Sequence, residues 1–101
     1  MKVDLTDEAK AQVRKRRDWW KKNREIKSAF NEELREARRQ LKNAPKLAVH
    51  GMREGLEVRR LTLSRIHCYI YYTIDEAEGL VLIVSLWGQE MAHQPDFVDE
   101  D

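Results

Sequence analysis

The pattern of apolar positions in residues 56–87 predicts three antiparallel strands joined by short turns. Residues 67–74 are β-branched, aromatic and almost uncharged, which is typical of a central strand. Residues 80–87 are apolar and should run back along it, and residues 58–63 alternate as a third strand does. Gly79 stands where a three-residue hairpin loop needs a left-handed residue.

The length of the hairpin loop decides which side chains share a face of this sheet. A three-residue loop sets Ile70 opposite Leu86 and Ile74 opposite Leu82. The resulting apolar face, expected to be the core, consists of Cys68, Ile70, Tyr72, Ile74, Leu82, Val84 and Leu86. The other face is aromatic but half polar, and consists of His67, Tyr69, Tyr71, Thr73, Ile83, Ser85 and Trp87. A slip of one residue in the pairing would exchange the two faces.

Two amphipathic helices are predicted before these strands. The first should begin after Thr6, whose hydroxyl can cap it, and end near Arg24. The second should run from about Ser28 to Asn43. Because only a few residues join them, we expect an antiparallel helical hairpin that packs on the core face of the sheet. The apolar positions at helical spacing are Ala9, Val13, Trp20, Phe30, Leu34, Ala37 and Leu41.

The remaining segments carry weaker signals. Residues 2–5 are compatible with an edge strand, and residues 46–55 contain two glycines without periodicity, which predicts a loop. Residues 88–97 are expected to form a loop or frayed tail, and residues 98–101 a disordered acidic tail. We therefore predict one α+β domain over residues 1–97, in the order β-α-α-β-β-β with a mainly antiparallel sheet.

The formal net charge of +1 hides an uneven distribution along the chain. Residues 1–50 hold fifteen Lys or Arg and eight Asp or Glu, whereas residues 51–101 hold four and ten. The basic half could bind nucleic acid or an acidic partner, or could be solvated helix faces. Trp19 and Trp20 lie within it and could stack bases or pack in the core. The candidate basic surface consists of Arg14, Lys15, Arg17, Lys21 and Lys22.

Several kinds of chemistry find no support in the sequence. The three histidines and the single cysteine, Cys68, lack metal-ligand spacing, and there is no glycine-rich phosphate loop. We therefore expect no cofactor and no metal. A lone cysteine also forms no disulfide framework, and no apolar run is long enough to cross a bilayer. These features predict a cytoplasmic protein.

Five short segments, taken in their order and spacing, resemble toxins of the RelE/ParE superfamily. They are residues 19–24, 30–34 and 41–45 in the predicted helices, and residues 58–65 and 69–72 in the predicted strands. The resemblance covers roughly residues 3–90. It implies a growth-inhibiting bacterial toxin of a type II toxin–antitoxin system, associated with plasmid stabilisation and neutralised by a cognate antitoxin encoded beside it.

The resemblance implies one of two activities. RelE-like members cut mRNA in the ribosomal A site with basic side chains and a tyrosine, whereas ParE-like members poison DNA gyrase. For an RNase the candidates here are Arg60, Arg65 and His67, but residues 88–95 contain no Arg, Lys or Tyr. We therefore favour a ParE-like gyrase inhibitor that is not an enzyme, with a ribosome-dependent endoribonuclease or a non-toxic, binding-only relative as alternatives.

The aromatic face of the sheet is the candidate surface for a partner. Exposed aromatic side chains in contact across strands favour a protein interface. The occupant could be the antitoxin, RNA bases, or the loop of residues 46–55 folded over it. The candidate antitoxin-binding residues are Tyr69, Tyr71, Ser85 and Trp87, with Arg59, or alternatively Arg60, at the margin of the face.

Overall fold

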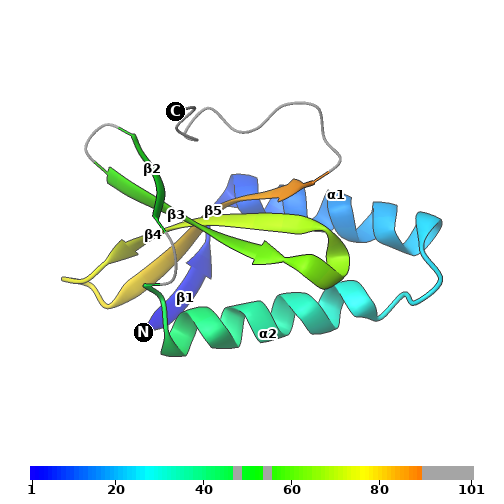
Figure 1. Ribbon diagram of the computed structural model, residues 1–101, viewed down its shortest axis with the longest axis horizontal. Coiled ribbons are helices and arrows are strands. Elements are labelled where there is room, and N and C mark those ends of the chain that lie inside the picture. The colour runs from blue at the N-terminus through cyan, green and yellow to red at the C-terminus, as the bar shows by residue number, and fades with distance from the viewer. Residues whose placement is uncertain (47–48, 54–55, 90–101) are drawn as a thin grey trace.

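The computed structural model describes residues 1–46, 49–53 and 56–89 of the 101-residue chain. Two helices accompany a five-stranded sheet of order β1-β5-β4-β3-β2, in which β1 is parallel to β5 and the other pairs are antiparallel (Figure 1). The elements are β1 (Lys2–Leu5), α1 (Asp7–Asn23), α2 (Ala29–Asn43), β2 (Val49–Arg53), β3 (Leu56–Leu63), the 3-10 helix η1 (Ser64–Ile66), β4 (Cys68–Asp75) and β5 (Leu80–Gly88). The predicted α+β class and the helical hairpin are confirmed.

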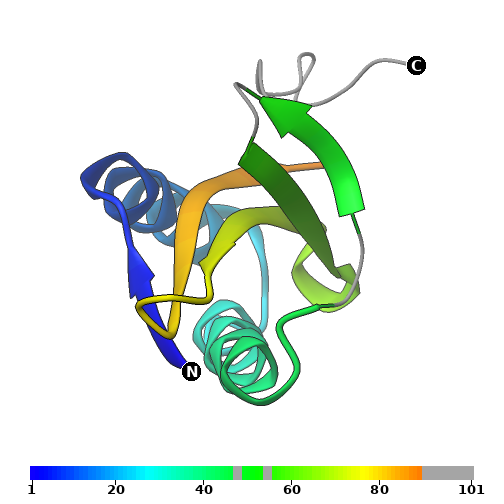
Figure 2. The same cartoon turned by 90° about the vertical axis from the view of Figure 1, so that its left-hand side faces the viewer.

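The two helices pack against different parts of the sheet. α1 lies mainly against β5, while α2 contacts η1, β1 and β3. The view along the helices shows the sheet curving around α2, with the β2–β3 ribbon rising away from both helices (Figure 2). The buried core is formed between them by Ala9, Val13, Trp20, Ala29, Phe30, Leu34, Ala37, Leu41, Leu63, Ile66, Cys68, Ile70, Tyr72, Val81, Ile83 and Leu86.

Local sequence signals explain where α1 begins and how it is held. The Thr6 hydroxyl accepts a hydrogen bond from the Ala9 backbone N–H at 3.1 Å, which satisfies one of the free donors of the first turn. At the other end Trp20 is buried, packs on Phe30 with ring centroids 6.4 Å apart, and donates its indole N–H to the Ile26 carbonyl at 2.9 Å. The predicted helix start and the packing role of Trp20 are both confirmed.

α1 extends the edge of the sheet beyond the point where β1 stops. β1 pairs with β5 as far as Ile83, whose carbonyl also accepts the Thr6 backbone N–H at 3.0 Å. Farther along β5, the Gln12 side-chain oxygen accepts the Leu86 backbone N–H at 2.9 Å and the Ser85 hydroxyl at 3.0 Å. A helix side chain thus accepts a backbone hydrogen bond that a neighbouring strand would otherwise accept.

The prediction that residues 46–55 form a loop is wrong for residues 49–53. Those residues form β2, which pairs antiparallel with β3 and has a register shift between Val49 and Gly51. The glycines and the missing alternation are compatible with a short, irregular edge strand, because such strands often carry bulges. The fold therefore has one strand more than the predicted order.

The predicted register is correct at one end of the β4–β5 pair and wrong at the other. Ile70 pairs with Leu86 as expected, but a β-bulge then places Tyr72 opposite Ile83 and Ile74 opposite Val81. An extra residue in one strand reverses which side chains face the core beyond it. Val81 and Ile83 are accordingly buried at 0% and 1% exposure, in place of the predicted Leu82 and Val84, which are half-buried.

The hairpin loop is also one residue longer than predicted. β4 ends at Asp75 and β5 begins at Leu80, which pair with each other, so four residues connect the strands. Gly79 has φ +62°, so its predicted left-handed conformation is confirmed. The turn is further held by the Asp75 carboxylate, which accepts the Glu78 backbone N–H at 3.1 Å.

Two predictions about the end of the chain lie largely outside the described residues. The loop expected over residues 88–97 is described only to Gln89, whose N–H donates to the His67 carbonyl at 2.8 Å. The tail expected over residues 98–101 is not described. Within the described part of the chain, no helix is both long and apolar enough to cross a membrane.

Candidate functional site

Three side chains form a compact cluster on the face of the sheet that points away from the core. Tyr69 and Tyr71 alternate with the core residues of β4, and their rings lie 6.4 Å apart. The Arg60 guanidinium stacks over the Tyr69 ring, 4.5 Å from its centroid, and hydrogen-bonds the Tyr71 hydroxyl. We call Arg60, Tyr69 and Tyr71 the tyrosine–arginine cluster.

The environment of this cluster favours the neutral form of the Tyr71 hydroxyl. Its side chain is 0% exposed, and burial raises the pKa of its hydroxyl above the ordinary value of 10, although the hydrogen bond from Arg60 and the charge of Arg60 act in the opposite direction. The Tyr71 hydroxyl is therefore neutral at physiological pH and is a poor proton acceptor from substrate.

The predicted aromatic face is less open than the sequence suggested. Tyr69 pairs with Trp87 and Tyr71 with Ser85, so the four share a face as predicted. However, Tyr71 and Ser85 are buried, and the Ser85 hydroxyl is bonded to Gln12 of α1. Tyr69 and Trp87 are half-buried and remain available at this face.

Arg59 does not lie on the face for which it was predicted. It pairs with Tyr72, which points into the core, whereas Arg60 pairs with Tyr71. Arg59 forms an ion pair with Glu57, and its side chain is 13% exposed. Alternation along β3 decides this placement, so Arg60 and not Arg59 belongs to the aromatic face.

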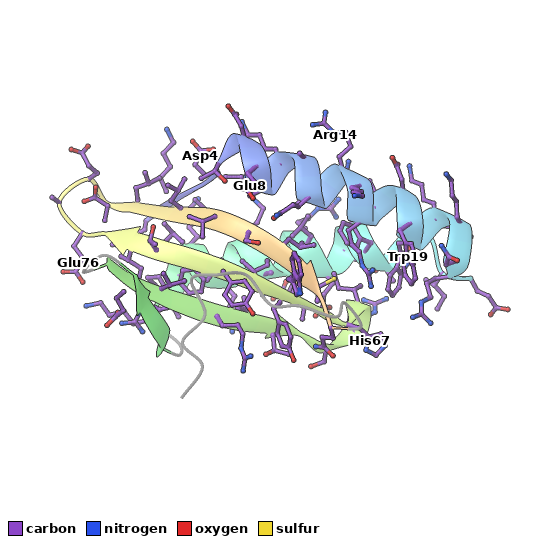
Figure 3. All side chains as sticks on the ribbon, turned by 90° about the horizontal axis from the view of Figure 1, so that it is seen from above. Asp4, Glu8, Arg14, Trp19, His67 and Glu76 are labelled. Atoms are coloured by element: carbon purple, nitrogen blue, oxygen red, sulfur yellow. The ribbon has the colours of Figure 1, made fainter. Side chains whose placement is uncertain are left out.

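The three candidate RNase residues do not converge. Arg60 lies in the tyrosine–arginine cluster, while Arg65 in η1 pairs with Glu32 of α2 at 3.5 Å. His67 has a left-handed conformation, φ 54°, between η1 and β4, so the alternation of β4 does not extend to it. Figure 3 shows His67 at the η1 end of the sheet, far from Glu76 in the β4–β5 turn at the other end.

The predicted basic surface is divided between two sides of α1. Arg14 and Arg17 line a groove shared with α2 and β1. Lys15 instead lines a depression with Trp19 and Trp87 at the end of β5. Figure 3 shows Arg14 pointing away from the sheet and Trp19 on the side of α1 nearer the strands. Lys21 and Lys22 are exposed in the last turn of α1, where cations favour the helix dipole.

Two groups of basic residues lie outside the basic surface predicted from the sequence. Arg16 and Arg24 both lie over the Trp19 ring, with their guanidinium carbons 4.0 and 5.3 Å from its centroid. Along α2, Arg35, Arg38 and Lys42 share one face, and their spacing of three and four residues was visible in the sequence. Among the described residues no group of His, Cys, Asp or Glu is arranged to hold a metal ion.

Comparison with known structures identifies the class of fold. The crystal structure of the isolated E. coli RelE toxin superposes with a TM-score of 0.65 at 15% sequence identity, over 90% of this chain and 86% of that one. The arrangement of helices and sheet is therefore that of a RelE-like toxin. A search of curated protein sequences finds no match.

The family is given by the sequence itself. Residues 3–93 match the model of the ParE toxin family of the type II toxin–antitoxin system parDE. This match covers most of the chain, so the chain belongs to the ParE toxin family. The predicted membership of the RelE/ParE superfamily is confirmed, and membership of a toxin–antitoxin family implies an antitoxin partner.

Proposed function

We propose that this chain inhibits growth by poisoning DNA gyrase and is neutralised in the cytoplasm by a cognate antitoxin. Its membership of the ParE toxin family supports a toxin of this kind. A poison of this type needs a binding surface and no catalytic residues of its own. The separation of Arg60, Arg65 and His67 in the structure agrees with this requirement.

The observation that carries the proposal is that, among the residues the structure describes, the neighbours of Arg60 include no general base. Cleavage of RNA at a 2′-hydroxyl requires a general base with a pKa near the working pH. Arg60 is permanently charged, and the pKa of its neighbour Tyr71 is raised. Arg65 is engaged with Glu32 near α2. The described residues of the cluster can bind a phosphate but supply no group to remove the proton.

We further propose that the antitoxin covers the aromatic face. Tyr69 and Trp87 pair across β4 and β5, are half-buried, and are of the residue types that dominate binding energy at protein interfaces. The indole N–H of Trp87 is buried and has no acceptor among the described residues, so a partner that rearranges this end of the face could supply one.

Two parallel assays on the purified toxin test the target. Gyrase supercoiling with detection of cleavage complexes should show inhibition, while programmed ribosomes should retain intact mRNA. Addition of purified antitoxin should restore supercoiling, which controls for a contaminating nuclease. Ribosome-dependent cuts without gyrase poisoning would overturn the proposal, and inactivity in both assays would indicate a binding-only relative.

A ribosome-dependent endoribonuclease is the second candidate, and the tyrosine–arginine cluster is the observation in its favour. A guanidinium held between two tyrosines is suited to bind a scissile phosphate. If this activity exists, Arg60→Gln should abolish mRNA cleavage and leave the melting temperature within a few degrees of the parent. Arg65→Gln, which removes the same charge elsewhere, is the matched control and should cleave normally.

A titration with the antitoxin tests the partner surface. Tyr69→Ala removes a half-buried ring from the aromatic face and should weaken antitoxin binding about tenfold. Ile26→Ala is the control, because Ile26 is 62% exposed in the connection between α1 and α2. Equal affinities of the two variants would place the antitoxin elsewhere.

A further inference from the structure

Three depressions with shared lining residues form a cationic groove along α1, α2 and β1. Three adjoining depressions share Arg38 as a lining residue, and two of them also share Arg17 and Leu34. Eight of their lining residues are Lys or Arg, and one, Asp4, is acidic. The cationic groove is lined by the basic residues Lys2, Lys10, Arg14, Arg17, Arg35, Arg38, Arg39 and Lys42.

The basic side chains form two rows, one on each helix. Residues 10, 14 and 17 are spaced by four and three residues and therefore share a face of α1. Residues 35, 38 and 42 share a face of α2 in the same way. Each row extends about 10 Å along its helix, from the rise of 1.5 Å per residue. Folding brings the two rows to opposite sides of one groove.

Little in the groove neutralises this charge. Arg39 is paired with Glu36, and Arg17 donates its Nε–H to the Asn31 side chain at 3.0 Å. Arg14 and Arg38 are exposed and form no ion pair within the described part of the chain. Asp4 uses one carboxylate oxygen to accept the Leu5 backbone N–H at 2.8 Å. A dense row of cations with so few acidic partners attracts a polyanion.

We propose that the cationic groove binds the phosphodiester backbone of duplex DNA. Lys and Arg contacts to phosphates supply most of the affinity of sequence-independent DNA binding, and guanidinium groups fit phosphate oxygens in pairs. This site is distinct from the tyrosine–arginine cluster and from the aromatic face. It goes beyond the gyrase proposal, because it predicts an interaction with naked DNA.

The lining residues favour a duplex over a single strand. Proteins that hold single strands stack the bases on aromatic side chains along the groove. No lining residue of the cationic groove is aromatic, and Trp20 is buried with its indole N–H bonded to Ile26. Trp19 belongs to the depression beside Trp87, on another side of α1. The groove can therefore contact backbone phosphates without unstacking a base.

The same residues disfavour an amphipathic helix of a protein partner. Such a helix needs an apolar floor into which its side chains insert. The most buried apolar lining residues, Val13 and Leu34, are only 7% and 8% exposed, because they already belong to the core. Charge along the rim is the principal feature that the groove presents.

Fluorescence anisotropy with a labelled duplex tests the proposal on the whole chain. The association constant should fall steeply with salt, about 40-fold between about 50 and 200 mM for three phosphate contacts. The double variant Arg14→Gln/Arg38→Gln should bind about tenfold more weakly at the lower salt, and its log–log slope should be smaller by about 2. Both side chains are exposed, so the fold should persist, as circular dichroism will verify.

The matched control is Lys15→Gln/Lys22→Gln, which removes the same charge from side chains about 80–100° around α1 from Arg14. Its DNA affinity should stay within about twofold of the parent. Equal losses in the two variants would mean a general charge effect and would overturn the proposal. The absence of duplex binding by the parent at low salt, or tighter binding of the single strand, would do the same. Loss of antitoxin binding by the groove variant with DNA binding intact would make the groove a protein site instead.

Discussion

At the scale of single residues, backbone conformation and buried polar groups decide which residues tolerate substitution. Gly79 holds a φ of +62° at the end of the β4–β5 turn, where side-chain-bearing residues are strained even though no atom obstructs an added Cβ. Tyr71 carries a buried hydroxyl that accepts a hydrogen bond from Arg60. The two residues therefore give different kinds of test, one of conformation and one of protonation.

Replacement of Gly79 by alanine should lower the free energy of unfolding by about 1 kcal/mol. The cause is the left-handed conformation alone, since nothing lies within 4 Å of the added methyl group. Urea denaturation measures the loss. Gly79→Asn is the control and should lose less, because asparagine tolerates this conformation better. An unchanged stability of the alanine variant would contradict the assigned turn.

Replacement of Tyr71 by phenylalanine should reduce the loss of stability in alkali. Burial raises the pKa of the Tyr71 hydroxyl in the folded state above its value of about 10 in the unfolded chain. The unfolded chain therefore releases this proton first, so the contribution is complete below pH 10 and is lost as the pH rises toward the folded-state pKa. Urea denaturation of parent and variant at about pH 8 and pH 11 measures the difference. An equal change in the free energy of unfolding between the two pH values for parent and variant would refute the prediction.

At the scale of elements, α1 and β5 are joined by contacts that neither element predicts alone. Gln12 receives two hydrogen bonds from β5 at the point where β1 no longer covers its edge. The bulge in the same strand then turns Val81 and Ile83 toward the core. One polar side chain and one inserted residue of β5 thus add to the apolar packing that holds α1 on the sheet.

Replacement of Gln12 by alanine should destabilise the fold by about 2 kcal/mol, because the part-buried Leu86 N–H and Ser85 hydroxyl lose their shared acceptor. Ser85→Ala removes one of those donors and leaves the other bonded, so its loss should be about half as large. Thermal or urea unfolding of the two variants provides the comparison. A larger loss for Ser85→Ala than for Gln12→Ala would show that the assigned bonds are not the main attachment.

At the scale of the whole molecule, the chain separates its surfaces by chemistry. The tyrosine–arginine cluster lies on the strand face that points away from the core, and the cationic groove lies on the outer side of the helices and β1. Arg65 belongs to neither surface, since it pairs with Glu32 of α2. This separation allows variants of one surface to be made without altering the other.

Replacement of Arg65 by glutamine should leave growth inhibition unchanged when the toxin is expressed without its antitoxin. The ion pair with Glu32 joins side chains that are 51% and 48% exposed, so its loss should change the free energy of unfolding by less than about 0.5 kcal/mol. Colony counts after induction measure toxicity, with urea denaturation as the check on stability. A non-toxic but stable variant would give Arg65 a functional role.

The sequence by itself determined the elements with a regular period. The helical spacing of Phe30, Leu34 and Leu41 and the capping hydroxyl of Thr6 predicted both helices within a residue of their observed ends. The β-branched and aromatic runs predicted β4 and β5, and Gly79 marked their turn. These signals suffice because they depend on residues within one turn of a helix or on adjacent positions of a strand.

The tertiary structure alone decided the features that join distant parts of the chain. The bulge opposite Tyr72 arises from pairing between two strands, so alternation within β5 could not reveal it. Burial of Ser85 depends on Gln12, which lies far away in the sequence. The cationic groove exists because packing sets Arg14 and Arg38 on neighbouring helices. Contacts between residues remote in sequence determine each of these features, and the periodicity of apolar residues along the sequence does not predict such contacts.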